Sequence, residues 1–338
     1  MAIIERKIKF ERNGKTVRRT VRANSEAEFL EKTRAILEKA AQESRITFTR
    51  VSEEWEEAHF KEIAYGTQIS YTPALRRARE YFGDAALDDV TPQDIKRLLD
   101  SLAMQKFSAK TVKTQKVVIG LVYKFAVIQG YTKTNPAEYV TLPKHLKTEQ
   151  RMPPEKGTVD IIKASISAPF GLFPYFILFT GCRRGEALAM RWSDIDSESN
   201  LVYVRQNIVF MNNKAVVNDH PKTKAGIRSI PLLSPLRTVL LAQPKEAAYI
   251  FANESGLPLT ETQYNHRLSA YKKATGAVFT PHQLRHEFAT VLYEAGVDAG
   301  VAQTIMGHAD IRTTQNIYTH IRQSKIQSAA ALLEKYVG

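Results

Sequence analysis

Six side chains in the second half of the sequence could together carry out phosphoryl transfer. Two arginines can neutralise the non-bridging oxygens of a phosphate in fork geometry. A lysine can donate a proton to a departing sugar oxygen, and histidines can bind the phosphate and accept the proton of a nucleophile. A tyrosine hydroxyl, with a free pKa of about 10, can then form a phosphoester link. These candidates are Arg183, Lys222, His282, Arg285, His308 and Tyr318.

The local spacing supports this interpretation at two places. Arg183 lies beside a glycine-containing turn and three residues before Glu186, and a helical pair at this spacing can hold the guanidinium in one orientation. His282 and Arg285 are also three residues apart and would share one helix face. No carboxylate cluster is placed to hold magnesium, so we expect the positive charge to come from side chains, with no metal or other cofactor.

Each candidate also has a simpler explanation when it is taken alone. A lone Arg183–Glu186 pair is most often an exposed ion pair of little energetic value. Tyr318, ten residues after His308, would by itself be an ordinary core or surface tyrosine. Lys222 and Lys224 point to the same side of an extended strand, so spacing does not choose between them as the proton donor.

A helical zinc site is the main alternative for the histidines. His282 and His286 have the i, i+4 spacing of a metal-binding pair. The zincin pattern, however, requires glutamate directly after the first histidine, and this sequence has Gln283 there. The spacing therefore favours a phosphate-binding role over a metal site.

The composition indicates a globular protein with a polyanionic partner. The 338 residues carry a formal net charge of +13, which favours nucleic acid, although a merely basic protein is the alternative. Cys182 is the only cysteine, so no disulfide can form within the chain, which fits a reducing cytoplasm. The N-terminus lacks the apolar core of a signal peptide, and the longest apolar run, residues 170–179, is too short to span a membrane.

Three regions are expected before the candidate catalytic residues. Residues 1–24 predict two strands around an Asn13-Gly14 turn, and residues 25–43 predict a helix, so residues 1–44 form a basic extension. It binds DNA through Arg18 and Arg19, or is only a solvated hairpin. Residues 46–142 read as a helical domain, followed by a polar, proline-containing linker at 143–157. Helices are expected at Val51–Ala64, Gln68–Tyr81, Thr91–Ala103 and Ser108–Gln129.

A row of lysines accompanies the last of these helices. A lysine-lined helix is either a solvated face or, in a chain this basic, a contact surface for phosphates. The candidate DNA-binding residues are Lys106, Lys110, Lys113 and Lys116.

Residues 158–338 predict a mixed domain. A helix at Val159–Ala168 precedes the apolar stretch and the Thr180–Glu186 segment, and the part after Leu236 reads as mostly helical. The segment from Pro221 to Gly226 would form the tip of a hairpin. Strands are expected at Leu201–Phe210, Ala215–Val217 and Gly226–Pro231.

Residues 46–338 resemble the tyrosine recombinase (phage integrase) family. The motifs occur in the family's order: Thr180-Gly181-Cys182-Arg183-Arg184-Gly185-Glu186, Lys222-Thr223-Lys224, His282-Gln283-Leu284-Arg285-His286, Gly307-His308 and Tyr318-Thr319-His320. The resemblance implies that Arg183 and Arg285 clamp the scissile phosphate and that Glu186 supports them. It assigns Lys222 as the general acid, His282 and His308 to proton handling and phosphate binding, and Tyr318 as the nucleophile that forms a 3′-phosphotyrosyl intermediate.

The resemblance also implies a mainly α fold with a small antiparallel β-sheet in the catalytic domain. A helical SAM-like core-binding domain and residues 158–338 would clamp duplex DNA, preceded by an extension similar to the arm-binding domain of integrases, with two strands in place of the usual three. The amphipathic tail after Tyr318 would dock on a neighbouring protomer, or pack on its own domain.

The function implied is integration and excision of a mobile element by a homotetramer, without ATP. A directionality factor and a host DNA-bending protein are further expected partners. The alternatives are a Xer-like resolvase of replicon dimers, a type IB-like relaxing activity, and a non-catalytic DNA-binding protein that retains the fold.

Overall fold

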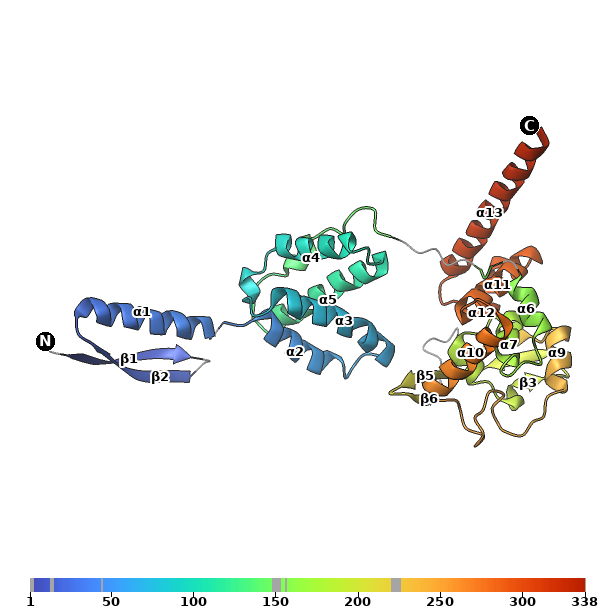
Figure 1. The fold of residues 1–338 in the computed structure, drawn as a ribbon, viewed down its shortest axis with the longest axis horizontal. Coiled ribbons are helices and arrows are strands. Elements are labelled where there is room, and N and C mark those ends of the chain that lie inside the picture. The colour runs from blue at the N-terminus through green and yellow to red at the C-terminus, as the bar shows by residue number, and fades with distance from the viewer. Residues whose placement is uncertain are drawn as a thin grey trace. The chain divides into compact units, whose positions relative to one another are not determined.

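The computed structural model describes residues 3–12, 15–43, 45–147, 153–155, 157–219 and 226–337. The chain divides into two compact units, residues 1–149 and 150–338 (Figure 1). Each unit has its own large hydrophobic core. Among the described residues, no helix is both long and apolar enough to cross a membrane.

The chain begins with the predicted hairpin and helix. Strand β1 (Ile4–Arg12) pairs antiparallel with β2 (Lys15–Ala23), and α1 (Glu26–Glu43) follows. The predicted Asn13-Gly14 turn lies outside the described residues. One face of the hairpin packs through Ile8 and Val21 against Phe29 of α1. This small core explains why a two-stranded hairpin, marginal when isolated, can persist here.

The four helices predicted for the next region are confirmed, with shifted ends. Helix α2 begins three residues earlier than predicted because Thr47 caps it by accepting a hydrogen bond from the Arg50 amide. It ends at His59, and the Gln68 side chain donates to the carbonyls of Phe60 and Ile63 beyond it. The elements are α2 (Phe48–His59), α3 (Tyr65–Phe82), α4 (Pro92–Met104), α5 (Ala109–Ile128) and the short 3₁₀ turns η1 (Leu87–Asp89) and η2 (Pro136–Tyr139).

The second unit combines short strands with helices. Its helices are α6 (Thr158–Ala164), α7 (Leu172–Thr180), α8 (Arg184–Leu188), α9 (Ser234–Leu241), α10 (Glu261–Thr275), α11 (Pro281–Glu294), α12 (Ala299–Met306) and α13 (Ile311–Val337), with a 3₁₀ turn η3 (Trp192–Asp194). Its strands are β3 (Ile195–Asp196), β4 (Leu201–Val204), β5 (Asn207–Met211), β6 (Lys214–Asn218) and β7 (Arg228–Pro231).

Three predictions about this unit are wrong in detail. The strand expected at Leu201–Phe210 is broken at residues 205–206 into β4 and β5, which enter different sheets. The hairpin expected between β6 and β7 is not formed in the described part of the chain, since β6 pairs with β5 and β7 pairs with β4. Helix α6 ends at Ala164 rather than Ala168, because the chain turns before Pro169.

The Thr180–Glu186 and His282–His286 motifs are brought together because helices α7 and α11 pack on each other. Phe173 and Phe176 of α7 lie in one core with Leu284 and Phe288 of α11. Helix α13 begins against α11 and α12, and its later part extends away from the other helices of this unit (Figure 1). In that part Ile321 is buried, whereas Ile326 and Leu333 are exposed, so the described apolar side chains of the tail are largely uncovered in the single chain.

Candidate active site

The segment from Thr180 to Glu186 is a sharp connection between α7 and α8. Gly181 ends α7 in the left-handed conformation with φ 63°, and a side chain there would meet Phe288 at 2.4 Å. Gly185 lies so close to the strand beneath it that an added Cβ would approach the Ile208 carbonyl oxygen to 2.3 Å. The two glycines therefore let the arginine-bearing turn sit directly on the core.

The turn directs its two arginines to different places. The Arg183 guanidinium donates to Glu186 Oε1 at 2.7 Å and to the Gly307 carbonyl at 2.8 Å. Arg184 instead lies over the rings of Phe210 and Tyr264, with its Cζ atom 5.3 Å and 5.5 Å from the ring centroids. Arg183 thus joins the other candidate residues, while Arg184 packs against aromatic side chains.

Arg285 reaches the same place from α11. Its guanidinium donates to the Gly181 carbonyl at 2.6 Å and to the Met306 carbonyl. Burial, followed by the positive charge of Arg183, lowers the pKa of Arg285 to about 9. Two guanidinium groups are therefore held on the consecutive carbonyls of Met306 and Gly307. Glu186 offers one negative charge against these two guanidinium groups, so the centre keeps a net positive charge that suits a phosphate.

His308 follows directly on this pair of carbonyls. Its Nδ1 atom forms a 2.9 Å hydrogen bond with the hydroxyl of the buried Thr314, and its backbone amide bonds to the Gln303 carbonyl. The ring is thereby fixed, and Nε2 is the nitrogen left for a substrate. Burial lowers the pKa of His308 to about 4, and the charges of Arg285 and Arg183 act in the same direction. The imidazole is neutral at pH 7.

The neutral state of His308 predicts a pH-dependent stability. The folded pKa of about 4 lies below the ordinary value of 6.5, so the unfolded chain binds the extra proton between these values. The contribution of the neutral His308 to the free energy of unfolding is fully present above pH 6.5, and it is lost as the pH falls towards about 4. We expect the melting temperature of the free wild-type protein to drop more steeply from pH 7 to 4 than that of His308→Gln. If the melting temperatures of the two proteins change equally with pH, the assigned protonation state of His308 is wrong.

The Tyr318 side chain is held by a backbone carbonyl and by a second tyrosine. Its hydroxyl donates to the Val297 carbonyl at 3.2 Å, and its ring packs edge-on against Tyr293, with centroids 5.0 Å apart. Burial and the charge of Asp298 raise the pKa of Tyr318. In this conformation the hydroxyl is a donor to backbone, so it must leave Val297 before it can act as a nucleophile.

The remaining candidates are distributed around this centre. His282 is exposed in the first turn of α11, and its charge acts on His308, whereas His286 is buried one turn further along. Lys222 and Lys224 lie outside the described residues. The buried Cys182 lies among the arginines, and burial raises its pKa to about 11, as expected for a thiol used in packing.

One buried residue of the site was not predicted. Arg228 of β7 donates to both carboxylate oxygens of Glu186, at 3.1 Å and 2.9 Å, and to the Ile305 carbonyl at 2.7 Å. A signal was present in the sequence. Arg228 has the same parity as the apolar Ile230, so strand alternation puts an arginine on the buried face and requires an internal partner for it.

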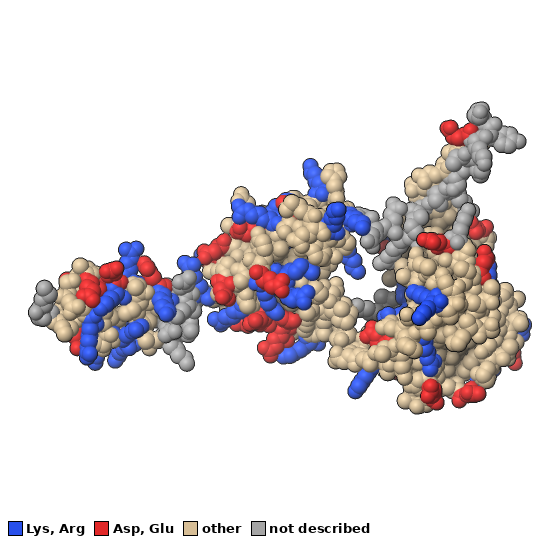
Figure 2. Space-filling model, in the orientation of Figure 1, with Lys and Arg blue, Asp and Glu red and all other residues tan. Residues whose placement is uncertain are grey.

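The candidate DNA-binding residues fall on several surfaces. Lys106, Lys110 and Lys113 are exposed, and Lys106 adopts φ 61° in the loop before α5. Lys116 is half-buried, so it presents less of its side chain to a partner. In unit 1, the face shown in Figure 2 carries acidic as well as basic side chains, so the positive charge there is interspersed.

The hairpin register separates the two arginines predicted there. Arg18 lies opposite Lys9 and Arg19 lies opposite Ile8. Since neighbours along a strand face opposite sides, Arg18 is on the open face of the hairpin and Arg19 is on the face that packs on α1. On the open face, Arg18 has the basic Lys9 directly opposite it.

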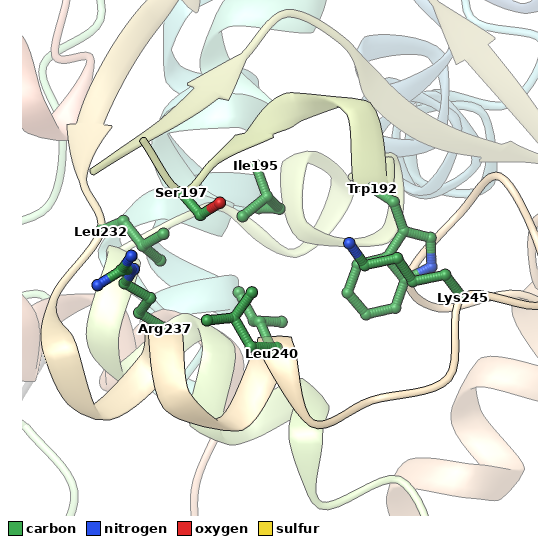
Figure 3. Close-up of a pocket in the computed structure, with 8 residues that line it drawn as sticks. Trp192, Ile195, Ser197, Leu232, Arg237, Leu240 and Lys245 are labelled. Carbon is green, nitrogen blue, oxygen red and sulfur yellow. The ribbon is translucent and has the colours of Figure 1, made fainter. Parts of the chain in front are cut away.

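A pocket elsewhere in the second unit has no part in this centre. Figure 3 shows it between the η3–β3 region and α9, with Trp192, Leu232 and Leu240 among its lining residues. Lys245 and Trp192 both line the pocket, and the Lys245 ammonium lies 5.9 Å from the centroid of the Trp192 ring. None of the residues discussed above lines this pocket. Among the described residues, no group of three or more His, Cys, Asp or Glu side chains could hold a metal ion.

In a mainly helical fold, Arg183, Arg285 and the neutral His308 meet at the C-terminal end of α12, an arrangement that suits the binding of a phosphate. Comparison with known proteins identifies its family. The sequence model of the phage integrase family matches residues 159–325, and that of the phage integrase N-terminal SAM-like domain matches residues 47–103. The chain belongs to the phage integrase family of tyrosine recombinases, and is thus a site-specific DNA recombinase.

Two relatives of this chain carry different names. A tyrosine recombinase XerC-like protein of Caldanaerobacter subterraneus subsp. tengcongensis is 28% identical over 262 residues, covering 67% of this chain and 66% of that protein. The transposase from transposon Tn916 of Enterococcus faecalis is 24% identical over 270 residues, covering 72% and 66%. The chain therefore spans about two thirds of the length of these relatives.

Solved structures show the same fold. The Tn1549 transposon integrase in complex with transposon right end DNA matches with a TM-score of 0.69 and 21% identity, over 84% of this chain and 100% of that one. A lambda integrase tetramer bound to a Holliday junction matches with a TM-score of 0.64 and 20% identity, over 93% and 94%. The predicted fold class is confirmed.

Proposed function

We propose that this recombinase cuts and rejoins duplex DNA through a 3′-phosphotyrosyl intermediate and that it integrates and excises a mobile element. Arg183 and Arg285 bind the scissile phosphate, and Glu186 holds Arg183. The observation that best supports this assignment is the convergence of the two guanidinium groups on the carbonyls of Gly307 and Met306, directly before His308.

The reaction follows from the chemistry of these groups. The Tyr318 oxygen attacks the scissile phosphorus as the bond from phosphorus to the 5′-oxygen breaks. Lys222 donates a proton to that leaving oxygen, and the neutral His308, with His282, binds the phosphate and handles the tyrosine proton. The arginines offset the charge that develops on the non-bridging oxygens. The phosphotyrosyl ester keeps the energy of the broken bond, so a 5′-hydroxyl of the second duplex can reverse the step without ATP.

The proposed assembly is a homotetramer that exchanges strands on two DNA duplexes. One solved neighbour is described as a lambda integrase tetramer on a Holliday junction, and the present fold matches it over most of its length. The exposed Ile326 and Leu333 in the tail of α13 would be covered by docking on a neighbouring protomer. A directionality factor and a host DNA-bending protein would be accessory partners of the reaction.

Covalent trapping tests the catalytic proposal. A DNA duplex nicked next to the cleavage site loses its free 5′-hydroxyl fragment after attack, so the phosphotyrosyl complex cannot reverse. We expect the wild-type protein to form a complex that survives denaturing electrophoresis, with the DNA attached to the peptide containing Tyr318. The matched control is the same sequence without the nick. Specific binding to the site without any covalent complex would support the non-catalytic alternative.

The mobile-element role is tested by removing the basic extension. Residues 1–44 have a small core of their own, around Val21 and Phe29, so their deletion leaves the core of α2–α5 intact. We expect the deletion to abolish integration between plasmid-borne sites while cleavage of the nicked core site continues, because the candidate active site lies in the second unit. Full recombination without residues 1–44 would instead favour the Xer-like role.

A relaxing activity of type IB is a separate outcome. Such an enzyme would remove supercoils from a single plasmid without a second site. One relative is named a tyrosine recombinase and the other a transposase, and both names favour strand exchange over relaxation.

A further inference from the structure

Several arginine side chains of the site are bound by backbone carbonyls at the C-terminal end of α12. The last carbonyls of a helix have no partner within it and carry the negative end of its dipole. Here the carbonyls of Gln303 and Thr304 accept from the amides of His308 and Gly307. The next three carbonyls each accept from a different arginine: Ile305 from Arg228 (2.7 Å), Met306 from Arg285, and Gly307 from Arg183 (2.8 Å).

Glu186 joins two of these arginines to each other. Its carboxylate accepts from both terminal nitrogens of Arg228 and from the Arg183 side chain, and it also accepts from the Arg183 amide at 2.8 Å. Bidentate contacts of this kind fix both partners in orientation as well as distance. The position of Arg183 therefore depends on Glu186, and the position of Glu186 depends on Arg228.

Burial separates the roles of these arginines. The Arg228 side chain is 2% exposed, whereas that of Arg183 is 46% exposed. Arg228 cannot touch a DNA phosphate without leaving its partners, while Arg183 has room to do so. Arg228 also donates to the carbonyl of Gly226, which adjoins the segment that carries Lys222. Its charge-assisted bonds thus reach α12, α8 and the start of β7 at once.

From this geometry we infer that Arg228 is a positioning residue of the recombination reaction: it holds Glu186 and the end of α12 so that Arg183, Arg285 and His308 meet the scissile phosphate together. The inference rests on the proposed function, and it adds a residue that acts through others and never contacts the substrate. It differs from an ordinary buried ion pair in what its partners do. Glu186 also holds Arg183, and Ile305 begins the row of three carbonyls whose other two members receive Arg285 and Arg183.

The first test compares rates of covalent trapping under single-turnover conditions. Arg228→Met should slow formation of the phosphotyrosyl complex by about 100-fold, because small displacements of positioned groups cost this much. The dissociation constant for the core site should stay within a factor of about two or three, since no DNA contact is lost. Arg228→Lys, which keeps the charge and part of the bonding, should recover part of the rate. The control is Arg237→Met, an exposed arginine on α9 that should leave the rate unchanged.

A pH profile separates positioning from a general loss of stability. Burial alone would raise the pKa of Glu186, but hydrogen bonds and charge from Arg228, with help from Arg183, lower it to about 2. Without Arg228 the pKa of Glu186 rises, so protonation at low pH removes the carboxylate that holds Arg183. The rate of Arg228→Met relative to wild type should therefore decrease as the pH is lowered. The same comparison made in a Glu186→Gln background should be independent of pH.

The outcomes are distinct. If wild type forms no covalent complex, the proposed function fails and this inference fails with it. If wild type is trapped and Arg228→Met is trapped equally fast, the proposed function survives and the positioning role is wrong. A pH dependence that persists with Glu186→Gln would also overturn the link through Glu186. Should Arg228→Met not fold, as judged by its melting transition, Arg228→Lys carries both comparisons.

Discussion

Replacing Tyr318 with phenylalanine should abolish the covalent protein–DNA complex while leaving DNA binding intact. The substitution removes one oxygen atom, which is the proposed nucleophile that forms the 3′-phosphoester. We expect trapping to fall by at least about 1,000-fold, which is the scale seen when a nucleophile is removed from a concerted site. The measurement is denaturing electrophoresis of the nicked core-site duplex, with binding followed separately by gel shift.

The neighbouring tyrosine supplies the matched control for this experiment. Tyr293 packs edge-on against Tyr318, so Tyr293→Phe removes a hydroxyl in the same local environment. It should retain covalent trapping. The lost hydrogen bond from Tyr318 to Val297 should cost little stability, on the order of 1 kcal/mol. If Tyr318→Phe is trapped as well as wild type, another residue is the nucleophile.

The conformation of Tyr318 adds a step that sequence could not reveal. A hydroxyl that donates to the Val297 carbonyl is held by backbone from the turn between α11 and α12. Tyr318 lies within α13, the same helix whose later part carries exposed apolar side chains. Movement of that tail can therefore be transmitted to the tyrosine through one continuous helix. Whether the tyrosine is released in the free chain or only when the tail docks is decided by comparing trapping at low and high protein concentration.

Sequence patterns predicted most elements because local signals were strong. Thr91 with Pro92 and Ser108 marked two helix starts that the structure confirms, since side-chain caps depend on neighbouring residues alone. The hairpin at the N-terminus was predicted from alternation in the same way. Some of the boundaries that were wrong depended on partners farther along the chain. Gln68 lies near the end of α2, and the separation of β4 from β5 follows from pairing with two different strands.

The sequence indicated which residue types make up the candidate site, but not which atoms they bind. Residue types and order pointed to Arg183, Arg285 and His308, because phosphoryl transfer demands those groups. The sequence carried no information that Met306 and Gly307 would receive the two guanidinium groups through their backbone carbonyls. Arg228 was missed for a related reason: its proposed function depends on Glu186 and Ile305, two partners that are distant along the chain, and strand alternation indicated only that it was buried.

Replacing Arg183 or Arg285 with lysine should reduce activity to a similar extent in both variants, while the two variants should differ in stability. Arg183→Lys and Arg285→Lys each keep a positive charge and lose the fork that holds two phosphate oxygens. We expect both to slow covalent trapping by at least about 100-fold, the scale associated with losing one preorganised donor to a developing charge.

Burial makes their stabilities diverge. Arg183 is 46% exposed at the side chain, so its replacement should change the free energy of unfolding by no more than about 1 kcal/mol. Arg285 is buried and satisfies the carbonyls of Gly181 and Met306, so lysine leaves at least one of them without a partner, at a cost of about 1–3 kcal/mol. Urea unfolding of both variants beside wild type measures the difference. Equal destabilisation of the two variants would contradict the stability difference expected from burial. Full trapping by either variant would mean that the replaced guanidinium is not needed to hold the phosphate.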